Sequence, residues 1–184
     1  MKITSVEVLH GDAGWQVWTF VKIMTDEGII GYGECSDNLT PRGIAGCIED
    51  LRPFLVGRDP RPIEMIYWDM YWRTRHSRGG IAQKAIAGIE CALWDIKAKA
   101  LGVPVYELFG GPTRDRVRLY WSHCGTERAT QQNILGTPPI RGLRDITELG
   151  QEVLKSGFTA LKTNLIIAAD PPSMIVQGGK RGLG

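Results

Sequence analysis

Two polar residues in an apolar stretch, Lys162 and Asn164, are the first candidates for chemistry in this sequence. They stand in TALKTNLI at 159–166, where the flanking residues are typical of a buried strand. An ammonium group in such a strand is costly unless binding or catalysis uses it. Alternate residues of a strand point the same way, so Lys162 and Asn164 should share a face opposite Thr163. The alternatives are a lysine that reaches water from the strand rim and an amide that satisfies backbone groups.

His123 is a further candidate, because it follows an apolar segment and could face a pocket from the end of a strand. Its alternative is a hydrogen-bonded histidine in the core. Cys124 has no partner in the sequence that supports a nucleophilic role. The four cysteines are widely spaced and contain no CxxC pair, which indicates reduced thiols rather than disulfides or a zinc site: Cys35, Cys47, Cys91 and Cys124.

The composition is that of an ordinary globular protein, with 184 residues, 43% hydrophobic and 23% charged. The formal charge is +2 and both signs are interleaved, so neither nucleic acid nor an anionic membrane is an expected partner. The first residues contain no apolar run of signal-peptide length, and no run reaches the roughly 18 residues of a membrane span. These features predict a cytoplasmic protein.

The first elements that must position any site are three strands, expected at 3–8, 17–24 and 29–34. Residues 25–28, Thr-Asp-Glu-Gly, have a turn composition whose glycine tolerates positive φ. The second and third strands therefore form a hairpin, and all three form an antiparallel meander.

Three helices are expected after the strands. The first starts at Thr40-Pro41, the second covers about 62–74, and the third covers 82–101 and ends at Gly102. The third has the strongest amphipathic pattern. Strands followed by helices indicate an α+β domain, which we place at 1–112.

A second domain is expected at 113–184. A strand at 117–124, an amphipathic helix at 144–156 and an apolar strand at 159–167 would form a βαβ unit with a parallel sheet. Two parallel strands cannot bury both their faces, so either the chain is a fragment or an irregular tail replaces more strands. We expect loop after 167 and an irregular insertion at 125–141.

Three stretches resemble the enolase superfamily, specifically its mandelate racemase and muconate lactonizing enzyme branch. They are TDEGIIGYGE at 25–34, AIAGIECALWDIKAKALGVPVYELFGG at 85–111 and GFTALKTN at 157–164. The second stretch is very specific. The KxN ending of the third and the RGG at 78–80 are most similar to galactonate dehydratase-like members.

The resemblance implies an α+β capping domain followed by the start of a modified (β/α)8 TIM barrel that is incomplete in this chain. It also implies Mg²⁺, held by carboxylates on barrel strands that this chain does not contain, which stabilises an enolate formed by α-proton abstraction. Lys162 matches the first lysine of the family's Lys-x-Lys pair, whereas Asn164 replaces the second and cannot titrate. Proton abstraction would then fall to a histidine on a later strand, with Lys162 and Asn164 binding the substrate carboxylate or a hydroxyl group.

Capping loops that close over substrate in the family correspond here to 10–15 and 34–38. Trp15 would supply an apolar wall, and Asp37 or Asn38 would bind a hydroxyl group. His123 would bind substrate from the end of the first barrel strand. The alternative is ordinary surface turns. A basic cluster follows the second helix, either as a solvated helix end or as a contact for an anionic substrate or a neighbouring subunit: Arg73, Arg75, His76 and Arg78. Asp95, within the third helix, should be a structural hydrogen-bond acceptor.

The function expected from the resemblance is a Mg²⁺-dependent dehydratase acting on an acid sugar, an aldonate of the galactonate kind. The alternatives are a racemase or cycloisomerase of the same branch, or an inactive fragment that serves only as a folding or oligomer-forming module. The partners expected are a small sugar-acid substrate and further copies of the chain, in a dimer or an octamer.

Overall fold

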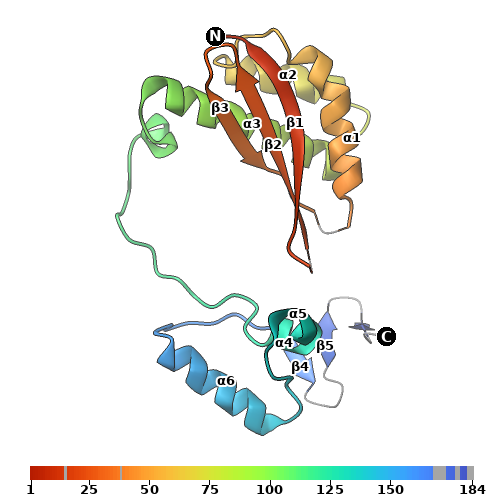
Figure 1. The fold of residues 1–184 in the computed structure, drawn as a ribbon, viewed down its shortest axis with the longest axis vertical. Coiled ribbons are helices and arrows are strands. Elements are labelled where there is room, and N and C mark those ends of the chain that lie inside the picture. Colours follow the sequence, from red (N-terminus) through yellow and green to blue (C-terminus); the bar gives the residue numbers. More distant parts are fainter. Residues whose placement is uncertain (15, 38, 168–172, 177–178, 182–184) are drawn as a thin grey trace. The chain divides into compact units, whose positions relative to one another are not determined.

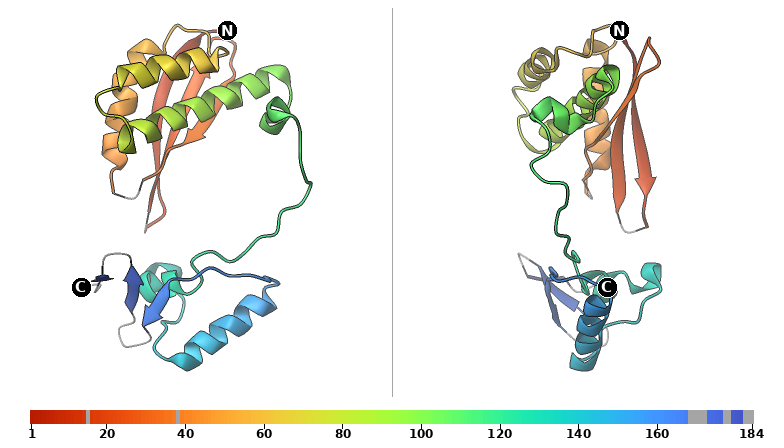
Figure 2. Two further views of the ribbon diagram at one scale, coloured as in Figure 1. Left: turned by 180° about the vertical axis from the view of Figure 1, so that it is seen from behind. Right: turned by 90° about the vertical axis from the view of Figure 1, so that its left-hand side faces the viewer.

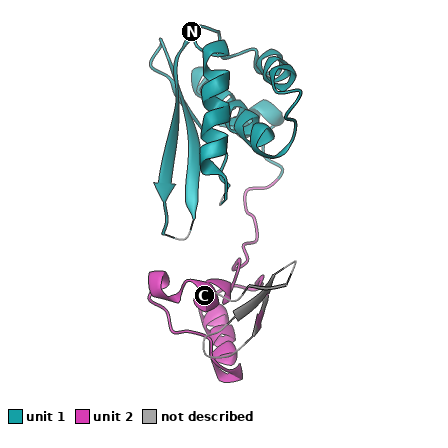
Figure 3. Cartoon of the chain, turned by 90° about the vertical axis from the view of Figure 1, so that its right-hand side faces the viewer, with its two compact units in different colours: residues 1–113 teal, residues 114–184 magenta. Residues whose placement is uncertain are grey.

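The chain forms two compact units, Met1–Thr113 and Arg114–Gly184 (Figure 3). The computed structural model describes residues 1–14, 16–37, 39–167, 173–176 and 179–181. The division lies one residue beyond the boundary expected between 112 and 113.

The first unit begins with a three-stranded antiparallel sheet in the order β1-β2-β3 (Figure 1). The strands are β1 Ile3–Asp12, β2 Val17–Thr25 and β3 Ile30–Glu34. Gly28 in the connecting turn has a φ of 77°, and its amide donates to the Thr25 carbonyl oxygen at 3.1 Å. The hairpin prediction is confirmed. The first strand is longer than expected, because its pairing with β2 continues as far as Asp12 and Val17.

Helices cover one face of this sheet (Figures 1 and 2). They are α1 Pro41–Leu51, η1 Arg52–Phe54, α2 Ile63–Arg73, α3 Gly80–Leu101 and η2 Val105–Phe109, where η marks a 3-10 helix. Gly102 ends α3 with a φ of 69°, as expected of a C-cap glycine. The three predicted α-helices are confirmed, and each bound that was predicted lies within two residues of the observed one.

The core of the first unit lies between the sheet and the helices. It contains apolar residues from every α-helix and from β1 and β2, among them Val6, Val21, Ile23, Ile44, Ile48, Ile66, Ile89, Leu93 and Ile96. β3 approaches α3 so closely that glycine is required at the contact. A Cβ atom on Gly33 would lie 2.0 Å from the carbonyl oxygen of Gly88.

Asp95 of α3 closes the free edge of β3. Its Oδ2 accepts hydrogen bonds from the Tyr32 amide at 2.9 Å and from Lys99 Nζ at 2.7 Å. Lys99 Nζ also donates to the Ile30 carbonyl oxygen at 2.7 Å. The expectation that Asp95 is a structural acceptor is confirmed.

We expect Asp95→Ala to lower the free energy of unfolding by about 1–2 kcal/mol, because the Tyr32 amide and the Lys99 ammonium lose a charged acceptor. Urea unfolding followed by circular dichroism measures the change. Lys97→Met, on the same helix, removes a cation that contacts the Trp94 ring and leaves the edge intact, so it serves as the control. An unchanged midpoint for Asp95→Ala would contradict the prediction.

The described residues of the second unit form three helices and a small antiparallel sheet in the order β4-β5-β6. The elements are α4 Thr126–Thr130, α5 Gln132–Leu135, α6 Leu143–Lys155, β4 Leu165–Ile167, β5 Ser173–Val176 and β6 Gly179–Arg181. Helix α6 confirms the helix expected at 144–156. The expectation of a wholly irregular segment at 125–141 is wrong, since α4 and α5 lie there. Loop throughout the stretch after 167 is also wrong, since β5 and β6 form.

The two strands predicted for this unit form only in part. Residues 117–124 contain no strand, and 159–167 contains only β4. The two segments meet in a single parallel bridge between Trp121 and Leu161. An apolar segment forms a strand only where its backbone amide and carbonyl groups pair with a neighbouring strand over several residues. These two segments pair at a single bridge. The direction of the bridge agrees with a βαβ unit, and the barrel itself stays a prediction.

A compact apolar cluster holds the second unit together. It is made of Cys124, Ile140, Leu149 and Val153, with Trp121, Phe158 and Ile166 packed against it. Arg128 Nη2 of α4 donates to both carboxylate oxygens of Glu152 on α6, at 2.6 and 2.7 Å. Among the helices described in either unit, none has the length and apolar character needed to cross a membrane.

Candidate functional site

The backbone around Lys162 is fixed by the parallel bridge. The Lys162 amide donates to the Trp121 carbonyl oxygen at 2.9 Å, and the Cys124 amide donates to the Lys162 carbonyl oxygen at 2.8 Å. The side chains of Leu161, Lys162 and Thr163 are exposed, so the expectation of burial is wrong for this stretch. The reason is that the segment has only one backbone neighbour, and its side chains remain uncovered.

A shallow hollow of about 370 Å³ contains Lys162. Its lining is formed by 118–120 from one segment and 160–162 from the other. Arg118 lies in the same hollow, and its guanidinium donates to Thr159 Oγ1 at 2.8 Å and to the Thr159 carbonyl oxygen at 2.7 Å. No side-chain partner of Lys162 is recorded within the described part of the chain. An ammonium group in this position is free to bind an anion such as a carboxylate.

Arg118 was not identified from the sequence. The only signal was a cation inside the apolar segment 117–121, and that pattern also fits a solvated strand face. Its bonds to Thr159 hold the two segments together beside Lys162. Arg118 therefore helps to keep the two segments that line the hollow in place, through its bonds to the hydroxyl group and backbone of Thr159.

Asn164 lies between the bridge and β4. Its backbone amide donates to Thr126 Oγ1 at 3.4 Å, and its backbone carbonyl oxygen accepts a bond from Thr163 Oγ1 at 3.0 Å. The Asn164 side chain is half-buried, whereas Lys162 is exposed. Residues 162–164 are outside any strand, so the shared face of Lys162 and Asn164 stays a prediction.

His123 follows the bridge in an unusual backbone conformation, with a φ of 53°. This left-handed region is uncommon for residues other than glycine and is enriched at functional sites. Its Nδ1 forms a 2.8 Å hydrogen bond with Ser122 Oγ, and the side chain is exposed. The alternative of a core histidine is therefore wrong, and substrate binding stays a prediction.

Three of the six predicted site residues come from the first unit, and only Asp37 is described. Trp15 and Asn38 lie outside the described residues. Asp37 Oδ1 accepts bonds from the Leu39 amide at 2.9 Å and the Thr40 amide at 3.1 Å, while Oδ2 forms an ion pair with Lys84 of α3. The Lys84 ammonium first, and then the Leu39 amide, hold the pKa of Asp37 well below its usual range. The carboxylate is thus charged and already engaged.

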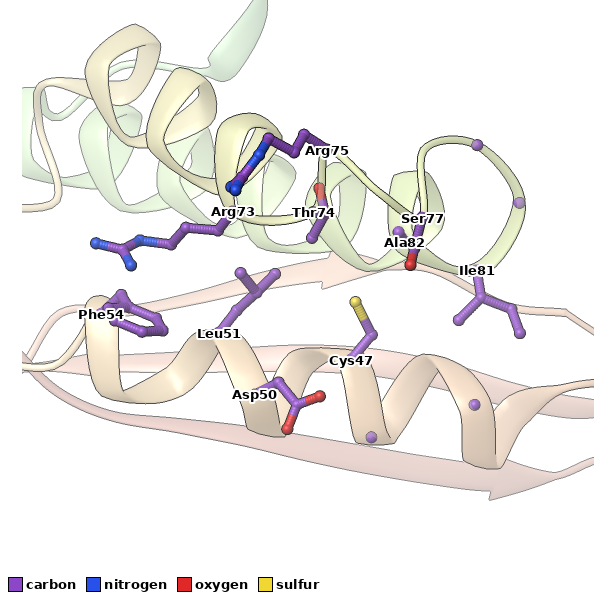
Figure 4. A pocket seen from close by; sticks show the side chains of 14 residues that line it. Cys47, Asp50, Leu51, Phe54, Arg73, Thr74, Arg75, Ser77, Ile81 and Ala82 are labelled. Atoms are coloured by element: carbon purple, nitrogen blue, oxygen red, sulfur yellow. The ribbon is translucent and has the colours of Figure 1, made fainter.

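An open pocket of about 1060 Å³ lies along α1 (Figure 4). Cys47, Asp50 and Leu51 line it from α1, and Arg73, the last residue of α2, and Arg75, in the turn after it, border the other side. The Arg73 guanidinium lies 3.5 Å from the centre of the Phe54 ring. None of the four predicted site residues that the structure describes lines this pocket, so its size alone does not make it the site of the expected chemistry.

Neither a metal centre nor an activated thiol is formed by the side chains described. No group of three His, Cys, Asp or Glu residues among them could hold a metal ion. All four cysteines are free. Burial raises the pKa of Cys35 to about 11 and raises the pKa of Cys124 as well, so both are protonated at neutral pH.

Comparison with known proteins gives consistent matches. Residues 4–110 match the N-terminal domain of mandelate racemase / muconate lactonizing enzyme. The chain is 43% identical over 156 residues to a D-galactonate dehydratase of Pectobacterium atrosepticum. These 156 residues cover 84% of this chain and 38% of that protein. Further relatives with that name are 40–48% identical. The chain thus spans well under half the length of these relatives.

Two solved structures extend the comparison. A proposed L-alanine-DL-glutamate epimerase from Burkholderia xenovorans, bound to magnesium and fumarate, has a TM-score of 0.84 and 42% identity, covering 93% of this chain and 42% of that one. An enolase from Pantoea ananatis with bound d-gluconate and magnesium has a TM-score of 0.71 and 28% identity, covering 89% of this chain and 37% of that one.

Proposed function

Because the chain belongs to the mandelate racemase / muconate lactonizing enzyme family, we propose that it forms the capping domain and first barrel strands of an acid-sugar dehydratase. The substrate in this proposal is an aldonate of the galactonate kind. The observation that carries it is the 43% identity over 156 residues to a D-galactonate dehydratase. The match covers only 38% of that relative, so the activity is proposed for the protein that includes the rest of the barrel.

The proposed reaction removes the proton α to the substrate carboxylate and expels the β-hydroxyl group as water. The resulting enol then gains a proton at the β-carbon and loses the proton of its enol hydroxyl group, which gives a 2-keto-3-deoxy acid. An α-proton beside a carboxylate is very weakly acidic, so stabilisation of the developing negative charge provides most of the rate increase. In this proposal the Lys162 ammonium binds the carboxylate and stabilises that charge.

The other site residues have binding roles in the same proposal. Asn164 and His123 bind substrate hydroxyl groups beside Lys162, and neither needs to act as the base. Trp15, Asp37 and Asn38 belong to the capping segments that surround the substrate and exclude water. The exposed Lys162 and the strained, exposed His123 support these roles, because both groups are accessible to a ligand.

A requirement for Mg²⁺ is part of the proposal. The two solved relatives described above contain magnesium. The described residues of this chain do not fit such an ion, because they contain no cluster of three suitable ligands. The ligands would therefore lie elsewhere in the protein, and bound Mg²⁺ would supply charge stabilisation.

The test is product analysis with the native gene product on a panel of sugar acids. We expect a 2-keto-3-deoxy acid from galactonate or a related aldonate, activity lost after EDTA treatment and activity restored by Mg²⁺. The isolated 184-residue chain should show no turnover, because its described residues hold no metal cluster. Mg²⁺-dependent turnover by that chain alone would contradict the proposal that the metal ligands lie on barrel strands elsewhere in the protein.

A racemase or epimerase is the second candidate, and the Burkholderia relative's name favours it. Such an enzyme exchanges the α-proton with solvent and releases no water. In deuterium oxide it would label the substrate and form no keto acid, whereas the dehydratase forms keto acid. If neither deuterium labelling nor keto acid is observed, a search for an isomeric product separates the two other readings, a cycloisomerase and an inactive module for folding or assembly.

We also propose that the protein is a cytoplasmic homo-oligomer, a dimer or an octamer. A row of large apolar side chains on α2 is exposed and supports association: Met65, Trp68 and Trp72. Light scattering coupled to size exclusion of the native gene product would measure the subunit number. A monomer at micromolar concentration would contradict this part of the proposal.

A further inference from the structure

The segment that joins β3 to α1, described at residues 35–37, 39 and 40, is hydrogen-bonded to the sheet at its first residues. The Cys35 amide donates to the Thr19 carbonyl oxygen at 2.9 Å, and the Thr19 amide donates to Ser36 Oγ at 3.0 Å. Thr19 is fully buried, so this end of the segment is well fixed. Residues 35 and 36 therefore continue from β3 in a defined position.

The other end of the segment depends on Asp37. Its Oδ1 accepts the Leu39 and Thr40 amides, which precede the first residue of α1. Thr40 is the N-cap of α1, yet its own side chain makes no capping bond. Asp37 therefore satisfies the backbone amides at this turn.

Lys84 connects this turn to a different element. It lies in the second turn of α3, 47 residues further along the chain, and its Nζ pairs with Asp37 Oδ2. The lysine and aspartate side chains are 43% and 22% exposed, so the pair is partly shielded from water. Because one carboxylate holds both the turn and Lys84, moving the lysine would move the segment.

We propose that Lys84 is a positioning residue that fixes residues 35–37, 39 and 40 through Asp37 and so sets the affinity and selectivity of the sugar-acid site. This inference rests on the proposed function, in which that segment borders the substrate. Asp37 then acts through the position of the segment, because both of its oxygens are already engaged. The hydroxyl-binding role expected of Asp37 would fall to neighbouring residues of the segment.

The first test measures the ion pair in the 184-residue chain, independently of activity. Carbon-detected NMR titration follows the carboxyl group of Asp37 in Lys84→Met, which keeps the length of the side chain and removes its charge. We expect the pKa of Asp37 to rise toward that of an ordinary aspartate. Lys84→Arg should retain the low pKa, and the control Lys97→Met, on the same helix, should leave it unchanged.

The second test uses the native gene product and sugar acids that differ at one hydroxyl group. Lys84→Met should raise KM by about 10- to 100-fold, change kcat little and reduce the discrimination between those substrates. Lys84→Arg should restore most of the affinity. A merely structural role would lower stability and would not separate KM from kcat in this way.

Three results would overturn the proposal in different ways. An unchanged Asp37 pKa in Lys84→Met means that the pair does not form in solution. A raised pKa with unchanged KM and selectivity means that the segment does not govern substrate binding, and the dehydratase function then stands. If the unaltered protein turns over no sugar acid, the proposed function and the role of Lys84 in selectivity both fail, while the titration still decides whether the ion pair exists.

Discussion

Gly33→Ala should destabilise the first unit severely, lowering the free energy of unfolding by about 3 kcal/mol or more. The added Cβ would lie 2.0 Å from the Gly88 carbonyl oxygen and 2.9 Å from the Ala92 amide nitrogen, and both are backbone atoms of α3. A flexible side chain could move aside, but a helix backbone can yield only by separating from the sheet. Separation would open the core between β3 and α3.

Urea unfolding of the 184-residue chain measures this effect, with Gly46→Ala as the matched control. Gly46 lies within α1, and nothing is within 4 Å of the position where its Cβ would stand. The same substitution there should raise the free energy of unfolding by about 0.5–1 kcal/mol, because alanine is the better helix former. Equal effects at the two positions would contradict the close packing of β3 on α3.

Lys162→Met should lower kcat/KM of the native dehydratase by about 10²- to 10³-fold, the second large effect that we expect. In the proposed reaction the substrate carboxylate gains negative charge as the α-proton leaves, and the ammonium group stabilises that charge. Methionine retains the length of the side chain and removes the cation. The loss should appear mainly in kcat, because the interaction strengthens in the transition state.

The thermal midpoint of Lys162→Met should remain unchanged, since the side chain is exposed and no partner for it is recorded among the described residues. Lys155→Met at the end of α6 removes an exposed lysine away from the hollow and provides the control for net charge. Lys162→Arg should recover part of the activity. Full activity in Lys162→Met would exclude the proposed role of Lys162.

The sequence predicted the first unit well because its signals are local. The turn at 25–28, the N-terminal proline of α1 and the periodicity of α3 each specify an element without help from distant residues. The core between one sheet face and the helices follows from that pattern. The end of β1 could not be predicted, because it depends on pairing with β2 rather than on its own composition.

The second unit was predicted less well because its apolar runs depend on distant partners. The segments 117–124 and 159–167 have strand compositions, yet the backbone hydrogen bonds between them make a single bridge, at Trp121 and Leu161, rather than a longer ladder. Of the site, the sequence singled out Lys162 and His123 as candidates, but it placed Lys162 in a buried strand, and the exposure of both side chains was found only in the structure. The link between Asp37 and Lys84 could not be predicted, because a single pair of charges 47 residues apart leaves no local pattern.

The closure of β3 by Asp95 and Lys99 also bears on how this protein avoids misassembly. An outer strand with unpaired amide and carbonyl groups is a template onto which another polypeptide can add, and repeated addition produces fibrous aggregates. Here helix side chains bond the outward Tyr32 amide and Ile30 carbonyl oxygen. Loss of Asp95 would thus expose a growth point, so a variant that is only slightly less stable could still precipitate much faster during synthesis and storage.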